Sequence, residues 1–331
     1  RCFTKRMGKR YVNQFSWLIA VTAGLVGSVI GCSKTEPSPE SAASVDRSQV
    51  FRFAPPDGME YTRTDRRTEE VAIVGAPVRR VDNEELRWRI RMGREGDGYR
   101  VKQDLVYLSL GRDGQTLAQG KLPEGISATL LIDNRGNLTR VEGLEKTAEI
   151  FRALVSPGRE AEAEQLITTQ TLSDLVASRY KIMFGDTIGR PSAPGSSWTI
   201  TNPPGSLVSS RTVTVTGHEA CGTATCARLQ VDFKLDPKVV TNAGVSMVKS
   251  SVSAAGEDAS KVAVKSANYD MRGWMLVEPA TMLSHGASLT EGGTVTVTDA
   301  EKGGEVTIQI KGATELSYSY ADNRVSERAP Q

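Results

Sequence analysis

The residues with the clearest chemical potential are Cys221 and Cys226, which flank four residues between two apolar stretches. Such a pair can form a disulfide, ligate a metal ion or carry out redox chemistry. His218 lies three residues before Cys221 and could add a ligand, but zinc takes four ligands and His285 is the only other histidine. Redox pairs usually have two residues between the cysteines, unlike this one. The spacing alone leaves a disulfide and a metal site open.

His218 and His285 also bear on hydrolytic chemistry. A Ser-His-Asp site needs only one histidine, so their small number permits such a site. The sequence has no Gly-x-Ser-x-Gly nucleophile elbow, however. We therefore predict no catalytic residue, no metal and no dissociable cofactor, and keep a hydrolase as an alternative.

Arg87, Arg89 and Arg91 form a row of cations on one face of a predicted strand, because they alternate with apolar residues. Such a row could bind lipid phosphates or polyanionic sugars through bidentate contacts. The alternative, which we favour, is a solvated face paired with acids such as Glu69 and Glu70.

Cys32 is a candidate for covalent modification. Val29, Ile30 and Gly31 precede it, at the end of an apolar run that is shorter than the roughly 20 residues needed to span a bilayer. The basic residues before the run are Arg1, Lys5, Arg6, Lys9 and Arg10. This layout resembles the lipobox of bacterial lipoprotein signal peptides. The resemblance implies cleavage before Cys32, diacylglycerol on its sulfur and acylation of the new amine; an uncleaved anchor is the alternative.

Cleavage at that point changes two inferences. The chain holds 41 Lys and Arg against 39 Asp and Glu, and loss of the five N-terminal bases leaves 36 against 39, a net charge of −3. A slightly acidic protein has no global electrostatic reason to bind nucleic acid. The envelope is also oxidising, which favours a Cys221–Cys226 disulfide over the metal or redox site.

The elements that must position these residues are mainly β (α+β). One-sided alternation at 86–92, 229–235, 306–310 and 316–320 predicts curved antiparallel sheets. Helical spacing appears at 144–155 and 159–184, and a third helix is expected from Pro237, with Asp236 as its N-cap.

The predicted organisation has six parts, of which two are β units. These parts are a signal peptide (1–31), a lipidated cysteine with a disordered tether (32–49), a first β unit with a C-terminal helix (50–156), a helical connector (157–190), a second β unit (191–320) and a disordered tail (321–331). Asp133–Gly136 and Asp270–Gly273 share the pattern Asp-x-Arg-Gly and predict equivalent hairpin turns. The two units are then half-barrel-like duplicates, with chance recurrence of a common turn as the alternative.

The body resembles bacterial envelope lipoproteins of unknown function, through the Gly-x-x-Trp element at Gly195–Trp198. It resembles more loosely the half-barrel lipoproteins that carry acylated proteins or lipids. We expect a non-enzymatic lipoprotein anchored in the outer membrane and facing the periplasm, which binds an apolar ligand, a lipid or another envelope protein. Candidate wall residues of such a cavity are Trp88, Ile90, Phe151 and Tyr180, with a place in an ordinary filled core as the favoured alternative for each. An envelope hydrolase and an adapter for another envelope protein are the alternatives.

Overall fold

Most of this chain consists of long strands, in which apolar side chains alternate with polar ones. The structure is a computed structural model and describes residues 50–77, 79–122, 125–153, 164, 167–254, 258–299 and 304–320. The strands of the first half are β1 (Met59–Ile73), β2 (Arg79–Glu95), β3 (Gly98–Arg112), β4 (Gln115–Lys121), β5 (Ser127–Ile132) and β6 (Leu138–Glu142). Those of the second half are β7 (Ser197–Thr201), β8 (Val208–Cys221), β9 (Ala224–Leu235), β10 (Val262–Val277), β11 (Ser284–Asp299) and β12 (Glu305–Tyr320).

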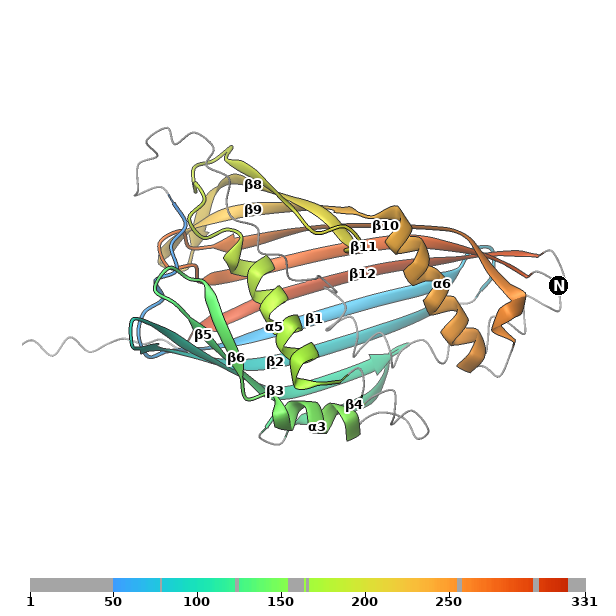
Figure 1. Ribbon diagram of the computed structural model, residues 1–331, viewed down its shortest axis with the longest axis horizontal. Helices are drawn as coiled ribbons and strands as arrows, with labels where there is room; N and C mark the ends of the chain where they lie inside the picture. The colour runs from blue at the N-terminus through green and yellow to red at the C-terminus, as the bar shows by residue number, and fades with distance from the viewer. Residues whose placement is uncertain are drawn as a thin grey trace, which may run out of the picture.

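The helical elements are fewer. They are α3 (Glu145–Ala153), α5 (Thr169–Tyr180) continued by a π-helical turn η2 (Lys181–Gly185), α6 (Pro237–Ala254) and a short 3₁₀ turn η3 (Ala259–Lys261). Helices α5 and α6 cross the same face of the sheet at different places along the strands (Figure 1).

All twelve strands belong to one antiparallel, curved and open sheet, in the order β6-β5-β3-β2-β1-β12-β11-β10-β9-β8-β7, with β4 added to β3 (Figure 1). The first and last long strands pair at its centre, from Tyr61 opposite Tyr320 to Ile73 opposite Ile308. The predicted fold class is therefore confirmed. Strands of both predicted β units lie in this single sheet. The boundaries of the two units stay a prediction.

The second Asp-x-Arg-Gly motif is not a turn, so that prediction was wrong. Asp133 is a turn residue: its carboxylate accepts the amides of Arg135 and Asn137, and Gly136 has a φ of 86°. Gly273 instead lies inside β10, paired with Val231 of β9 and Leu289 of β11. Strand partners on both sides leave no room for a hairpin, and a Cβ on Gly273 would meet the Ser288 carbonyl oxygen at 2.6 Å.

The three predicted helical regions each contain a helix, but the stretch predicted over 159–184 is interrupted at Ile167 and Thr168, where the backbone is not helical. The Asp236 carboxylate accepts the amides of Lys238 and Val239, which satisfies the first turn of α6. Helices α3 and α5 fall inside the two stretches predicted at 144–155 and 159–184, and η2 ends one residue beyond the second. Residues 154–163 of the connector lie outside the described part of the chain, as do the tether up to residue 49 and the tail from 321.

Two apolar cores hold the helices to the sheet. The larger core gathers side chains from the ends of the strands, from α3 and α5, and from Phe51 and Phe53 at the start of the described chain. The smaller core lies under α6 and contains Val248, Val252 and Val295. The space between α3, α5 and the first-half strands is not filled, and it forms the cavity described next.

Candidate ligand cavity

A cavity of about 660 Å³ lies between the concave face of β1, β2, β3 and β5 and the helices α3 and α5. This volume is within the range of small-molecule sites, roughly 300–1,000 Å³. The four predicted wall residues Trp88, Ile90, Phe151 and Tyr180 all line it. Tyr318 of β12 also lines the cavity, whereas α6 packs on β10, elsewhere on the sheet.

The strand pattern explains the apolar wall. On β2, Leu86, Trp88, Ile90 and Met92 face the cavity while the arginines between them are exposed. The other main apolar contributions come from β3, β5 and the helices: Val101, Leu105, Leu108, Leu130, Leu144, Ile150, Leu172, Leu175 and Val176. Helix α5 is fixed at its start by Thr168, whose hydroxyl accepts the Thr171 amide at 3.0 Å.

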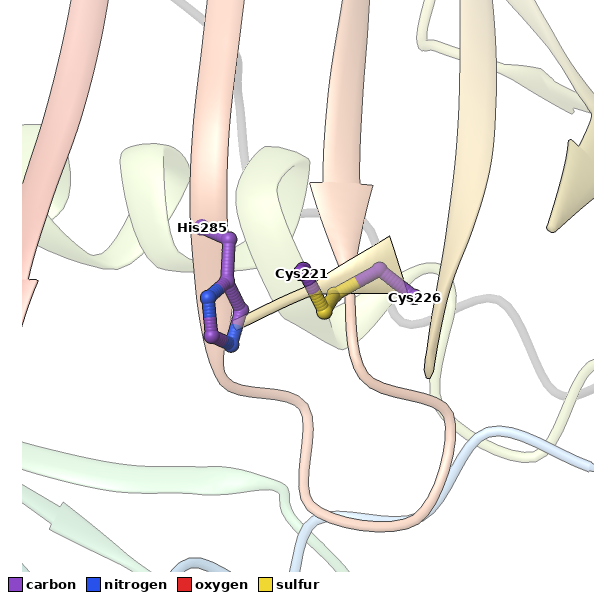
Figure 2. Close-up of side chains that lie close together, drawn as sticks. All are labelled: Cys221, Cys226 and His285. Atoms are coloured by element: carbon purple, nitrogen blue, oxygen red, sulfur yellow. A yellow bond between two sulfur atoms is a disulfide. The ribbon is translucent and has the colours of Figure 1, made fainter. Parts of the chain in front are cut away.

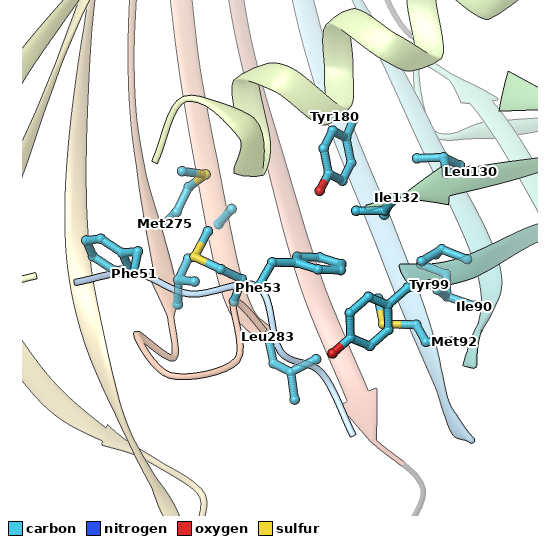
Figure 3. Close-up of a cluster of buried hydrophobic side chains, with 14 of the residues drawn as sticks. Phe51, Phe53, Ile90, Met92, Tyr99, Leu130, Ile132, Tyr180, Met275 and Leu283 are labelled. Atoms are coloured by element: carbon cyan, nitrogen blue, oxygen red, sulfur yellow. The ribbon is translucent and has the colours of Figure 1, made fainter. Parts of the chain in front are cut away.

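One end of the cavity is sealed by aromatic side chains. Phe53 packs edge-on against Tyr99 and Tyr180, with ring centroids 5.3 and 6.3 Å apart (Figure 3). The buried Tyr180 hydroxyl donates to the Gly136 carbonyl oxygen at 2.7 Å. Phe51 is fully buried against Trp198, and its backbone forms hydrogen bonds with residues 189 and 190. The segment that precedes β1 thus fastens the helical connector to the end of the sheet.

The cavity also has a polar wall, along the inward side of β1. Asp65 binds two arginines: Arg63 through Nε at 2.7 Å and Nη2 at 3.1 Å, and Arg179 of α5 through Nη2 at 3.0 Å. Burial, which raises the pKa of Asp65, is outweighed by the two cations, so the pKa lies below its usual range. Arg63 and Asp65 are both buried, with side chains 9% exposed, whereas Arg179 is 40% exposed and lines the cavity.

A second group lies two residues further along β1. Arg67 donates to Glu69 at 2.7 Å and to Glu291 of β11 at 2.8 Å. Glu84 of β2 is the strand partner of Arg67 and also lines the cavity. Burial raises the pKa of Glu84 to about 7, and the like charges of Asp65 and Glu69 add to this rise. The cations of Arg67 and Arg179 act in the opposite direction.

Trp88 joins the apolar and polar walls. The Arg63 guanidinium lies over its ring, 5.4 Å from the centroid. Its buried indole Nε1 has no hydrogen-bond partner among the described residues. A buried N–H group that makes no hydrogen bond is costly, so this polar atom is an exception in a mostly apolar wall.

The sequence pattern did not reveal this polar wall. The side chains that point inward from β1 are Arg63, Asp65, Arg67 and Glu69. The residues between them are also polar, so the alternation of side chains does not show which face of the strand is buried. Glu69, expected as a partner of the exposed arginine row, is instead buried on the concave face. The signal that could have found the wall is the charge alternation itself, since opposite charges two residues apart on a strand share one face.

The arginine row that could bind anions lies on the other side of the sheet from the cavity. Arg87, Arg89 and Arg91 are exposed. Arg87 pairs with Glu85 and stacks on Tyr107, and Arg91 pairs with Asp104. These ion pairs are typical of a solvent-exposed sheet face whose arginines are neutralised by acids on the same or the neighbouring strand.

The structure contains the predicted disulfide between Cys221 and Cys226 (Figure 2). His285, rather than His218, is the histidine beside it, with ligand atoms of the three side chains within 4.8 Å of one another. His285 Nε2 bonds Glu278 at 2.7 Å, and His218 Nε2 bonds the Ser192 carbonyl at 2.8 Å. Since both sulfurs are in the disulfide, neither is available as a thiolate ligand, and neither histidine lines the cavity.

The lipidation motif Val29, Ile30, Gly31 and Cys32 lies outside the described residues. Within the described part of the chain, no helix has the length and apolar character required to cross a membrane.

No protein-family model and no curated protein matches this chain. Among solved structures, a lipovitellin studied for lipid–protein interactions is similar over 83% of this chain and 26% of its own, with 11% identity and a TM-score of 0.39. A protein from Bacteroides fragilis described as exported, with a YmcC-like fold, is similar over 82% of this chain and 99% of its own (10% identity, TM-score 0.23). A domain from Vibrio parahaemolyticus described as an outer-membrane lipoprotein-sorting protein is similar over 78% and 86% (9% identity, TM-score 0.13). With all three TM-scores below 0.5, inferences about function rest on this chain's own residues.

Proposed function

We propose that this chain is a non-enzymatic, membrane-anchored envelope lipoprotein that binds an apolar or lipid ligand in the cavity between the first-half strands and α3 and α5. The observation that carries the proposal is the cavity of about 660 Å³ with its mostly apolar wall. A filled core between the same elements would instead favour a module that binds only through its surface.

The proposed anchor is the lipid on Cys32, and the proposed location is the periplasmic side of the outer membrane. The basic N-terminal segment and the lipobox-like residues before Cys32 support the anchor. Ser33 follows the cysteine, which resembles outer-membrane sorting in Gram-negative systems. Two or more acyl chains are enough for stable anchoring.

The ligand proposal is tested by titrating the purified chain with N-phenyl-1-naphthylamine, whose fluorescence rises in apolar surroundings. The chain carries Cys32→Ala, so that no covalent lipid competes for the cavity. Ala128 of β5 lines the cavity and is buried, and a Phe at that position would occupy part of the volume. We expect Ala128→Phe to weaken probe binding at least tenfold.

The matched control is Ala263→Phe, which adds the same ring to an exposed position on β10. We expect this variant to bind the probe as the parent chain does. Equal probe binding by both variants would mean that the probe enters somewhere other than this cavity, and the proposal would fall.

A further inference from the structure

The charges in the cavity wall are unevenly distributed, because one cluster has more cations than acids. Arg63 and Arg179 share the single carboxylate of Asp65, so this cluster has one excess positive charge. Along the same wall, Arg67 is matched by two acids, Glu69 and Glu291. The excess charge is therefore local to Arg179 and its neighbours.

Arg179 is the member of the cluster that a ligand can reach. Its side chain lines the cavity and is 40% exposed, whereas Arg63 and Asp65 are each 9% exposed. Asp65 is its only ion-pair partner among the described residues, reached through Nη2. The nearby cation of Arg63 and burial lower the pKa of Arg179, and the single carboxylate of Asp65 opposes them.

Glu84 is the acid that could supply the missing charge from within the wall. Burial raises its pKa to about 7, so below that pH it is mostly neutral. The groups that face it are Arg67, Asp65 and Glu69 from β1 and Arg179 from α5; its partner on β3 is the uncharged Leu110. Glu84 forms no ion pair with any described residue.

A neutral donor lies beside the cations. Trp88 packs against Arg63 and keeps its buried indole N–H without an acceptor among the described residues. An anionic oxygen beside Arg179 would accept charge-assisted hydrogen bonds from its guanidinium, and Trp88 would line the cavity next to the cluster. Such charge-assisted bonds are stronger than bonds between neutral groups.

We infer that the ligand of this cavity is a single-chain amphiphile with a carboxylate head group, which pairs with Arg179 beside Trp88 while its hydrocarbon chain lies along the apolar wall. This inference rests on the proposed function and specifies its ligand class. One negative charge matches the one excess positive charge of the cluster. A planar carboxylate also suits a guanidinium, whereas a phosphate monoester carries about −1.5 to −2 charges.

The test compares hexadecanoic acid with hexadecan-1-ol, which has the same chain and no charge. Each displaces N-phenyl-1-naphthylamine from the Cys32→Ala chain at pH 6. We expect the acid to bind at least tenfold more tightly than the alcohol. Arg179→Gln should remove most of this difference while leaving the affinity for the alcohol unchanged, because a hydrogen bond to a charged group contributes about tenfold or more.

Arg179→Gln is the suitable variant because it leaves the buried Arg63–Asp65 pair intact and charge-balanced. Circular dichroism and thermal unfolding would verify its fold. Arg89→Gln, on the exposed side of β2, is the control and should bind both compounds as the parent does.

The outcomes separate the two levels of the proposal. Equal affinity for acid and alcohol in the parent chain, with probe binding intact, overturns the carboxylate inference and leaves apolar binding in place. An unchanged preference for the acid in Arg179→Gln also overturns it. If neither the probe nor either compound binds, the proposed function itself fails.

Discussion

Replacing Glu84 by Gln should stabilise the protein at alkaline pH and leave it unchanged at acid pH. Burial holds the pKa of Glu84 near 7, compared with 4.5 for a free glutamate side chain. In the unfolded chain the carboxyl group ionises above 4.5, whereas in the folded chain it does so only above 7. The free energy of unfolding therefore has its full value below pH 4.5, falls as the pH rises to 7, and stays reduced above pH 7.

The expected size follows from the difference between these two pKa values. At 1.36 kcal/mol per pKa unit, values of about 7 and 4.5 correspond to about 3 kcal/mol, as an upper limit for a side chain that is partly accessible from the cavity. In a domain of this size the gain amounts to a rise of about 5–10 °C in melting temperature. Glu84→Gln should show that gain at pH 8 and none at pH 4.5.

The assay is thermal unfolding of parent and variant at several pH values between 4 and 8.5. Glu85→Gln is the neighbouring control, because Glu85 accepts hydrogen bonds from Arg66 and Arg87 on the outer face. Its curve should keep the shape of the parent curve. Parallel pH profiles for Glu84→Gln and the parent would refute the assignment of a buried, mostly neutral carboxyl group at this position.

Three further predictions concern other parts of the chain. Replacing Cys221 and Cys226 together by Ala should lower the free energy of unfolding by about 2 kcal/mol in urea titrations, as expected for a short closed loop; no change would contradict the disulfide. Asp236→Ala should cost about 1 kcal/mol in the same assay, because α6 loses its N-cap; an equal loss on Asp236→Asn would argue against that cause. Cys32→Ala should remove the acyl mass that mass spectrometry finds on the parent chain; a parent chain without acyl mass would refute lipid anchoring.

Much of the fold could be predicted because its signals are local. On β2, apolar residues at every second position gave the inward face directly, and Asp236 before Pro237 marked the start of α6. The turn predicted at Asp270–Gly273 failed because the same residue types can serve a turn or a strand. Hydrogen bonding to β9 and β11 on both sides decided in favour of the strand, and no local pattern reports that.

The cavity was only partly predictable. Its apolar residues, such as Trp88 and Phe151, follow from periodicity, but whether they fill a core or surround a space depends on how far α5 stands from the sheet. The charged wall was missed for another reason. Arg179 and Asp65 are 114 residues apart in the sequence. They pair only because α5 crosses the sheet at the level of Asp65 along β1, and no local pattern predicts that position.

The pairing of β1 with β12 has a consequence for how the protein is made. The centre of the sheet is completed only when β12, the last described strand, pairs with β1, the first described strand. Contacts between such distant parts of a chain form slowly. Until β12 docks, β1 and β11 each present a long unpaired edge, which is a template for aggregation. We expect the chain to remain unfolded, or bound to a chaperone, until residues 305–320 are available to pair with β1.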